Sequence, residues 1–117
     1  MIQRRGVTAR YADSVSWAGT VYLVEVPANP GEDIAAQTRN VLASIERQLV
    51  ESGSDKTRLL SATIYLRTLT DYDAMNAVWD AWVPAGCAPS RACIEARLVN
   101  PDWRIEIAVT AATGGRA

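Results

Sequence analysis

The sequence predicts a small α/β protein in which two helices cover one face of a mixed sheet. Three observations support this: two segments have helical periodicity, the segments around them alternate with a period of two, and the elements follow in the order β-β-α-β-α-β-β. Helical segments between strands imply crossover connections, which place the helices against the sheet. With 117 residues the chain has room for one domain, residues 1–117, and one layer of helices.

The first two strands are expected in the opening part of the chain. The segment from Tyr11 to Val26 is rich in β-branched and aromatic residues, and Thr20 to Val26 in particular suits a strand. Residues 17–19 fit the turn of a hairpin, and the turn residues at 27–31 end this part of the sheet.

A two-sided helix of about five turns is expected next. Glu32 and Asp33 lie at its start, where the helix dipole favours negative charge, and Gly53 follows its last turn as a stop signal. The residues at helical spacing that form its apolar face are Ile34, Val41, Leu42, Ile45 and Leu49.

A third strand and a second helix follow. The buried face of the strand is expected to contain Leu60, Ala62, Ile64 and Leu66. Thr70 and Asp71 prepare the second helix, and Pro84 with Gly86 ends it. The apolar face of this helix consists of Tyr72, Met75, Val78, Trp79 and Trp82.

Two further strands, Ser90 to Leu98 and Trp103 to Ala111, complete the sheet on either side of the turn residues at 100–102. No segment then remains to cover the second face of the sheet. We therefore expect that face to pack on another subunit, and closed cyclic symmetry is the usual arrangement.

Composition argues against several classes of function. The formal net charge is −1, so no basic surface for nucleic acid is expected. The chain has no histidine, which removes Ser-His-Asp and Cys-His catalysis and the usual zinc sites. No run approaches the about 20 apolar residues of a membrane span, and the basic start lacks an apolar signal segment. We expect a cytoplasmic protein whose two cysteines are free thiols.

Arg91 is the first candidate for a binding residue. On its strand it shares a face with Cys93 and Glu95. An arginine within a short apolar strand needs a partner, and its planar fork matches a carboxylate. That carboxylate belongs either to a ligand or to an acidic side chain such as Glu95, Glu106 or one of a neighbouring subunit. The residues alone favour the structural ion pair.

Glu106 is the second candidate. It alternates with Ile105 and Ile107 on the last strand, which places it with Arg104 and Ala108 on the less apolar face. As an ordinary residue it is solvated; if burial raises its pKa, it serves as a general base for water.

The spacing of Arg91 and Glu106 gives a geometric test. A tight hairpin centred on Pro101 would separate them by about 16 Å along the strand, which is too far for one small substrate. Either the last two strands do not form that hairpin, or the site is completed across a subunit boundary.

Two motifs on these strands resemble the signature of the RidA (YjgF) family. The run from Ala88 to Ala96 contains Pro89-x-Arg91, and Ile105-Glu106-Ile107 follows on the last strand. The likeness extends from Pro27 to Ala112, because both helical segments and the strand between them follow the family pattern in order. Several weak motifs in the right order make chance agreement improbable.

The resemblance implies a chorismate-mutase-like fold assembled as a homotrimer, with active sites at the subunit clefts and neither metal nor organic cofactor. Members hydrolyse reactive 2-imino and 2-enamino acids, such as 2-aminoacrylate and 2-iminopropionate, to a 2-keto acid and ammonia. By this likeness Arg91 binds the substrate carboxylate and Glu106 holds the attacking water. The backbone at Cys93 helps to position that water, and Tyr11 is a weaker candidate for a substrate contact.

The N-terminal part departs from the family pattern. Tyr11 follows Ala9-Arg10 where family deaminases commonly have Gly-Pro, and Val24 and Glu25 replace a small hydroxyl residue and a glycine. The valine removes a hydroxyl, and the glutamate adds negative charge where an anionic substrate approaches. Two alternatives to a deaminase therefore stand. One is a non-catalytic relative that binds a small carboxylate as a sensor or partner subunit, and the other is an interaction protein in which Arg91 only bridges subunits.

Overall fold

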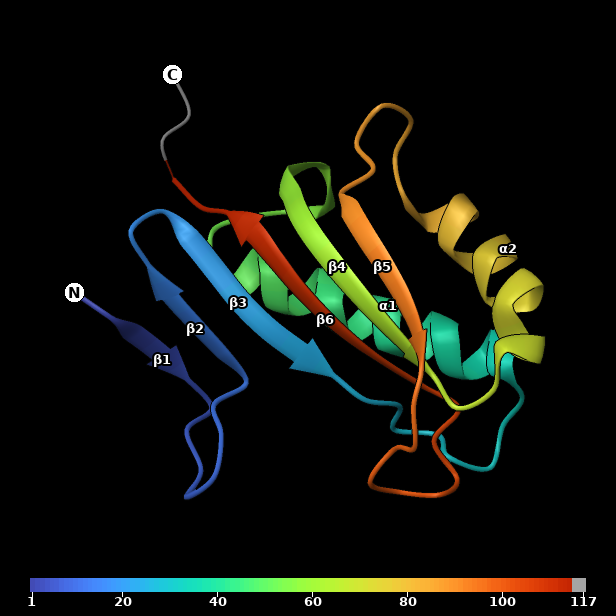
Figure 1. Cartoon of the computed structure of the whole chain (residues 1–117). Coiled ribbons are helices and arrows are strands. Elements are labelled where there is room, and N and C mark those ends of the chain that lie inside the picture. The colour runs from blue at the N-terminus through green and yellow to red at the C-terminus, as the bar shows by residue number, and fades with distance from the viewer. Residues whose placement is uncertain (115–117) are drawn as a thin grey trace.

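A computed structural model describes residues 1–114. It contains a six-stranded sheet with the strand order β1-β2-β3-β6-β4-β5, and α1 and α2 lie against one face (Figure 1). The predicted fold class is confirmed. The helices and strands in chain order are β1 Gln3–Arg5, β2 Ser14–Trp17, β3 Thr20–Glu25, α1 Ile34–Glu51, β4 Leu59–Leu66, α2 Tyr72–Trp82, β5 Ser90–Glu95 and β6 Ile105–Ala112.

The topology places β5 at one edge of the sheet and β6 at its centre. β6 is antiparallel to both of its neighbours, β3 and β4. β4 and β5 are parallel, and α2 forms the crossover between them. The side chains of β5 therefore lie at a rim of the sheet, next to α2.

The ends of α1 agree with the signals in the sequence. Asp33 is the N-cap, and its side chain accepts a hydrogen bond from the Ala36 N–H at 2.9 Å. Gly53 follows the C-cap Ser52 with φ +81°, a left-handed conformation that a residue without a Cβ adopts at low cost.

The core lies between the sheet and the two helices. Met75 and Trp79 of α2 are buried there, and Trp82 packs on its border. Trp82 Nε1 also donates a hydrogen bond to Glu46 Oε1 of α1 at 3.0 Å, which ties the two helices together. The largest fully buried apolar side chains of the described residues are Leu42, Ile45, Leu49, Ile64, Leu66, Met75, Ile105 and Ile107.

Leu60 departs from the expected alternation of β4. Leu59 is 8% exposed, whereas Leu60 is 49% exposed. The ladder between β4 and β6 shifts register between Leu59 and Ser61, so Leu60 is the extra residue of a β-bulge. The prediction that Leu60 is buried was wrong, because the extra residue of the bulge interrupts the alternation of buried and exposed side chains along β4. The rest of the buried face, Ala62, Ile64 and Leu66, is confirmed.

The strand boundaries differ from the prediction in three places. β1, at residues 3–5, pairs with β2 but was not predicted, because all three of its residues are exposed and no apolar alternation marks them. β5 ends at Glu95, three residues before Leu98, and β6 begins at Ile105 rather than Trp103. The long connection between β5 and β6 therefore occupies residues 96–104.

The second face of the sheet carries no helix in the described part of the chain (Figure 1). Tyr22 and Val24 of β3 are 47% and 53% exposed on it, and Ile94 of β5 is 46% exposed. We call this surface the open face; it includes an open hollow of about 380 Å³ over β3, β6 and β4. Neither described helix has the length and apolar character that crossing a membrane requires.

Candidate functional site

The Arg91 side chain lies on the helix-covered side of the sheet. In the parallel register Arg91 is level with Ala62, whose side chain is in the core. Arg91 Nη1 donates to Asn76 Oδ1 at 2.8 Å, and Nη2 donates to the Tyr72 hydroxyl at 3.3 Å. The guanidinium also lies 5.3 Å from the Trp79 ring centroid and 5.9 Å from that of Tyr72, within the range of cation–π contacts.

All of these partners are neutral. Among residues 1–114, no carboxylate forms an ion pair with Arg91. The structural alternative, a salt bridge to Glu95 or Glu106 of the same chain, is therefore not formed. A guanidinium held by neutral acceptors and aromatic rings keeps its full charge for an anionic partner.

A cleft of about 480 Å³ opens beside the guanidinium, lined by Leu69, Tyr72, Arg91 and Cys93. Its volume is in the range of small-ligand sites. Burial raises the pKa of the Cys93 thiol more than the neighbouring Arg91 lowers it, which favours the unreactive neutral thiol. A larger apolar groove of about 690 Å³ lies between α1 and α2 and contains none of these cleft residues.

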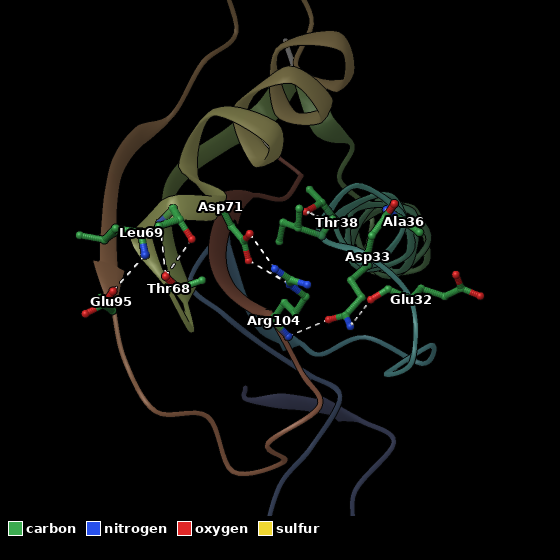
Figure 2. A network of polar contacts seen from close by, with 12 residues as sticks. Glu32, Asp33, Ala36, Thr38, Thr68, Leu69, Asp71, Glu95 and Arg104 are labelled. Atoms are coloured by element: carbon green, nitrogen blue, oxygen red, sulfur yellow. Dashed lines mark hydrogen bonds and ion pairs between the residues drawn. The ribbon is translucent and has the colours of Figure 1, made fainter.

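Glu95 is hydrogen-bonded to Leu69, one of the residues that line this cleft. Its Oε1 accepts a hydrogen bond from the Leu69 N–H at 3.0 Å (Figure 2). Leu69 begins the short 3₁₀ turn that leads into α2. The contact therefore joins the end of β5 to the start of the helix that holds Arg91.

Glu106 lies on β6 and faces the opposite side of the sheet. Ile105 and Ile107 beside it are fully buried under the helices, so Glu106 points toward the open face, where it is level with Tyr65 of β4. Burial raises the pKa of its carboxyl above the ordinary value. A raised pKa brings a carboxylate closer to the pH at which a general base works best.

Arg91 and Glu106 of one chain are far apart. β4 lies between β5 and β6, so the last two strands form no tight hairpin. Arg91 is level with residue 62 and Glu106 with residue 65 of β4, an offset of about 10 Å along the strands, and two strand spacings add about 10 Å across them. Since the two side chains also face opposite sides, no small substrate contacts both within one chain.

Tyr11 is remote from both residues within the chain. It lies in the loop between β1 and β2 and is 64% exposed. This loop is at the β1–β2 side of the sheet, whereas β5 is at the other edge (Figure 1). Four strand spacings, about 19 Å, separate β2 from β5.

Val24 and Glu25, the two residues of β3 that differ from the family pattern, point to opposite sides of the sheet. Val24 is exposed on the open face, where it is level with Ala108 of β6. Glu25 alternates to the helix side, where its carboxylate lies near Gln48 and Arg47 of α1. The glutamate therefore directs its charge away from Glu106, and the valine alone alters the open face.

Glu25 is expected to make stability depend on pH. Burial, with a smaller effect of Asp13, raises the pKa of Glu25 despite the opposing effects of Arg47 and Gln48. Because folding favours the protonated carboxyl, Glu25 contributes stability at a pH below its pKa in the unfolded chain. This stability is lost as the pH rises through its pKa in the folded protein. At pH 7, Glu25→Gln should therefore unfold at a higher urea concentration than wild type. The expected gain in the free energy of unfolding is at most about 1 kcal/mol after solvent screening. The gain should vanish near pH 4.

The control for this measurement is Glu51→Gln, which removes an exposed carboxylate from the last turn of α1. At high salt, which screens the interaction of this carboxylate with the helix dipole, its unfolding midpoint should follow the wild-type midpoint at both pH values. Equal midpoints for Glu25→Gln and wild type at pH 7 would show that burial of this carboxylate costs no stability.

Arg104 does not share the face of Glu106, contrary to the prediction. Its Nε and Nη2 donate to the two carboxylate oxygens of Asp71 at 3.0 and 2.9 Å, toward the helix layer (Figure 2). The Arg104 N–H donates to Gln37 Oε1 of α1 at 2.7 Å. β6 begins only after Arg104, so the alternation that places Glu106 does not include it. The network instead anchors the segment before Glu106 to both helices.

Sequence reasoning missed the environment of Arg91. It assigned Tyr72 to the apolar face of α2, but this side chain is 40% exposed and contacts the guanidinium. A signal was present, since Tyr72 and Asn76 are four residues apart and share a helix face. What the pattern did not reveal is that this face meets β5. The described residues also contain no cluster of three potential metal ligands.

Comparison with known proteins defines the family. The family model described as Endoribonuclease L-PSP matches residues 1–113. A crystal structure of a YjgF family member from Neisseria meningitidis is 51% identical, with a TM-score of 0.95 over 99% of this chain and 98% of that one. The chain belongs to the YjgF/L-PSP family. The resemblance to RidA (YjgF) proteins is thereby confirmed.

Curated relatives of this YjgF/L-PSP chain carry the name RutC. A RutC family protein from Haemophilus ducreyi is 45% identical over 113 residues, which is 96% of this chain and 97% of the relative. The 3-aminoacrylate deaminase RutC of Acinetobacter baylyi is 40% identical over 79 residues, 68% of this chain and 62% of that protein. The family thus includes a protein named for deamination of an enamino acid.

Proposed function

We propose that this YjgF/L-PSP protein hydrolyses reactive 2-imino and 2-enamino acids, of the 2-aminoacrylate and 2-iminopropionate type, to a 2-keto acid and ammonia. The observation that carries the proposal is the Arg91 guanidinium, which neutral groups hold beside a cleft while no described carboxylate pairs with it. The deaminase name of a family relative supports the same reaction class.

The chemistry requires little beyond orientation. Arg91 binds the substrate carboxylate through its planar fork and so fixes the imine carbon. Glu106 takes a proton from a water molecule as its oxygen adds to that carbon, and the imine nitrogen receives that proton to give a carbinolamine. The hydroxyl proton of the carbinolamine then passes to the nitrogen as the C–N bond breaks, so that ammonia leaves and the carbonyl forms. An enamine first gains a proton at carbon and loses one from nitrogen to become the imine. No redox change occurs in any step.

The proposed site is formed between subunits. Arg91 and Glu106 lie on opposite sides of the sheet within one chain, and the open face lacks a covering layer in the described residues. We propose a homotrimer in which Arg91 of one subunit and Glu106 of the next face one cleft. Tyr11 of an adjoining subunit then contacts the substrate, and the backbone at Cys93 positions the water.

The proposed setting is the cytoplasm, with no nucleic acid as a partner. Cys87 and Cys93 are both free thiols, as a reducing compartment favours. The family description names an endoribonuclease. A chain with net charge −1 and no histidine is poorly suited to bind and cut RNA. We therefore propose deamination rather than RNA cleavage.

A second candidate is a non-catalytic protein that binds a small carboxylate at the same cleft. Val24 favours it, because this exposed residue of the open face stands where family deaminases have a hydroxyl. Such a protein binds pyruvate through Arg91 but does not accelerate imine hydrolysis.

An amino acid oxidase that generates 2-imino acids in the assay separates the two candidates. With the oxidase held constant, the deaminase proposal expects faster release of the 2-keto acid when the protein is added. An unchanged rate over a range of amino acids, with pyruvate still bound, would replace it by the binding proposal.

A further inference from the structure

Tyr72 offers the Arg91 guanidinium two kinds of contact. Tyr72 is the first residue of α2, and its hydroxyl accepts a hydrogen bond from Arg91 Nη2 at 3.3 Å. Its ring centroid lies 5.9 Å from the guanidinium carbon, and the side chain lines the cleft next to Leu69. A half-buried arginine on an edge strand still samples several rotamers unless neighbouring groups hold it.

The donors of Arg91 are divided between the protein and the cleft. A guanidinium has five N–H donors. Asn76 takes one from Nη1 and Tyr72 takes one from Nη2, so both outer nitrogens are held from the side of α2. Three N–H groups remain, which is enough for a bidentate contact with one carboxylate. The two α2 residues thus fix the plane of the guanidinium and leave enough N–H donors free for a carboxylate.

We propose that Tyr72 is a positioning residue that orients Arg91 for the substrate carboxylate. This inference rests on the proposed function, because it takes the carboxylate to be that of the 2-imino acid. Arg91 contacts the carboxylate in the ground state and in the transition state alike. Without the Tyr72 hydroxyl, Asn76 still holds the fork that places the imine carbon, so the loss should weaken binding much more than it slows the chemical step.

Tyr72→Phe tests this role, since it removes the hydroxyl and keeps the ring. The variant should raise KM for the imine and Kd for pyruvate about fivefold, with kcat within about twofold of wild type. In an Arg91→Lys background the same change should alter the Kd of pyruvate by less than about twofold, because lysine lacks the fork that Tyr72 orients. Asp80→Asn, on an exposed position of the same helix, is the matched control and should match wild type.

The outcomes separate this inference from the proposed function. Turnover by wild type with an unchanged KM and Kd in Tyr72→Phe overturns the inference and leaves the function standing. A fall in kcat with unchanged KM also overturns it. If wild type binds pyruvate without turnover, the deaminase proposal fails and the Kd values still decide the role of Tyr72. If wild type neither turns over the imine nor binds pyruvate, both proposals fall.

Discussion

Arg91→Ala is expected to lower kcat/KM for a 2-imino acid about 100- to 1,000-fold while leaving the fold intact. The loss corresponds to a bidentate, charge-assisted contact with the substrate carboxylate. The fold should tolerate the change because Asn76 and Tyr72, the hydrogen-bond partners of Arg91, are both partly exposed and gain water in its place. Keto acid release from oxidase-generated imine measures the effect.

Arg91→Lys and the oligomeric state serve as controls for this variant. Lysine keeps the charge and loses the planar fork, so it should recover only part of the activity. Analytical ultracentrifugation should give the same molar mass for wild type and both variants. An Arg91→Ala protein that is fully active, or one that falls to monomers, would instead assign Arg91 to a role outside substrate binding.

Glu106→Gln is expected to lower kcat about 100- to 1,000-fold, as loss of a general base does. The base acts in its deprotonated form, so wild-type kcat should rise with pH as Glu106 loses its proton. Because burial raises the pKa of Glu106, the increase in kcat should occur at a higher pH than it would with an ordinary glutamate. The residual activity of the variant should lack that limb of the profile.

Glu51→Gln is the matched control, since it makes the same substitution at an exposed glutamate of α1. Its pH profile should overlay that of wild type. A Glu106→Gln protein with wild-type kcat and an unchanged pH profile would remove Glu106 from the mechanism.

The elements that follow one periodic pattern could be predicted from the sequence. The boundaries of α1 and α2 follow from apolar spacing together with Asp33 and Gly53 at the ends of α1 and Pro84 after α2. These signals are local, because capping and helix termination depend on residues within a few positions. The order of helices and strands could be read for the same reason, β1 excepted.

The features that depend on distant contacts could not be predicted. The insertion of β4 between β5 and β6 is a matter of strand order, which residue spacing does not encode. The bulge at Leu60 depends on the register with β6. The direction of the Arg91 side chain depends on the packing of α2 beside β5. The sequence indicated that Arg91 and Glu106 could be distant, but only the structure shows that they face opposite sides of the sheet.

The central claim is that Arg91 and Glu106 of different subunits form one site. It is tested by co-refolding Arg91→Ala and Glu106→Gln chains with two different affinity tags and purifying the mixed assemblies over both. In each mixed trimer about one third of the sites should combine an intact Arg91 with an intact Glu106, so about one third of the wild-type activity should return. Mixed trimers no more active than the parent variants would contradict the account, because they would show that both residues act from the same chain or not at all.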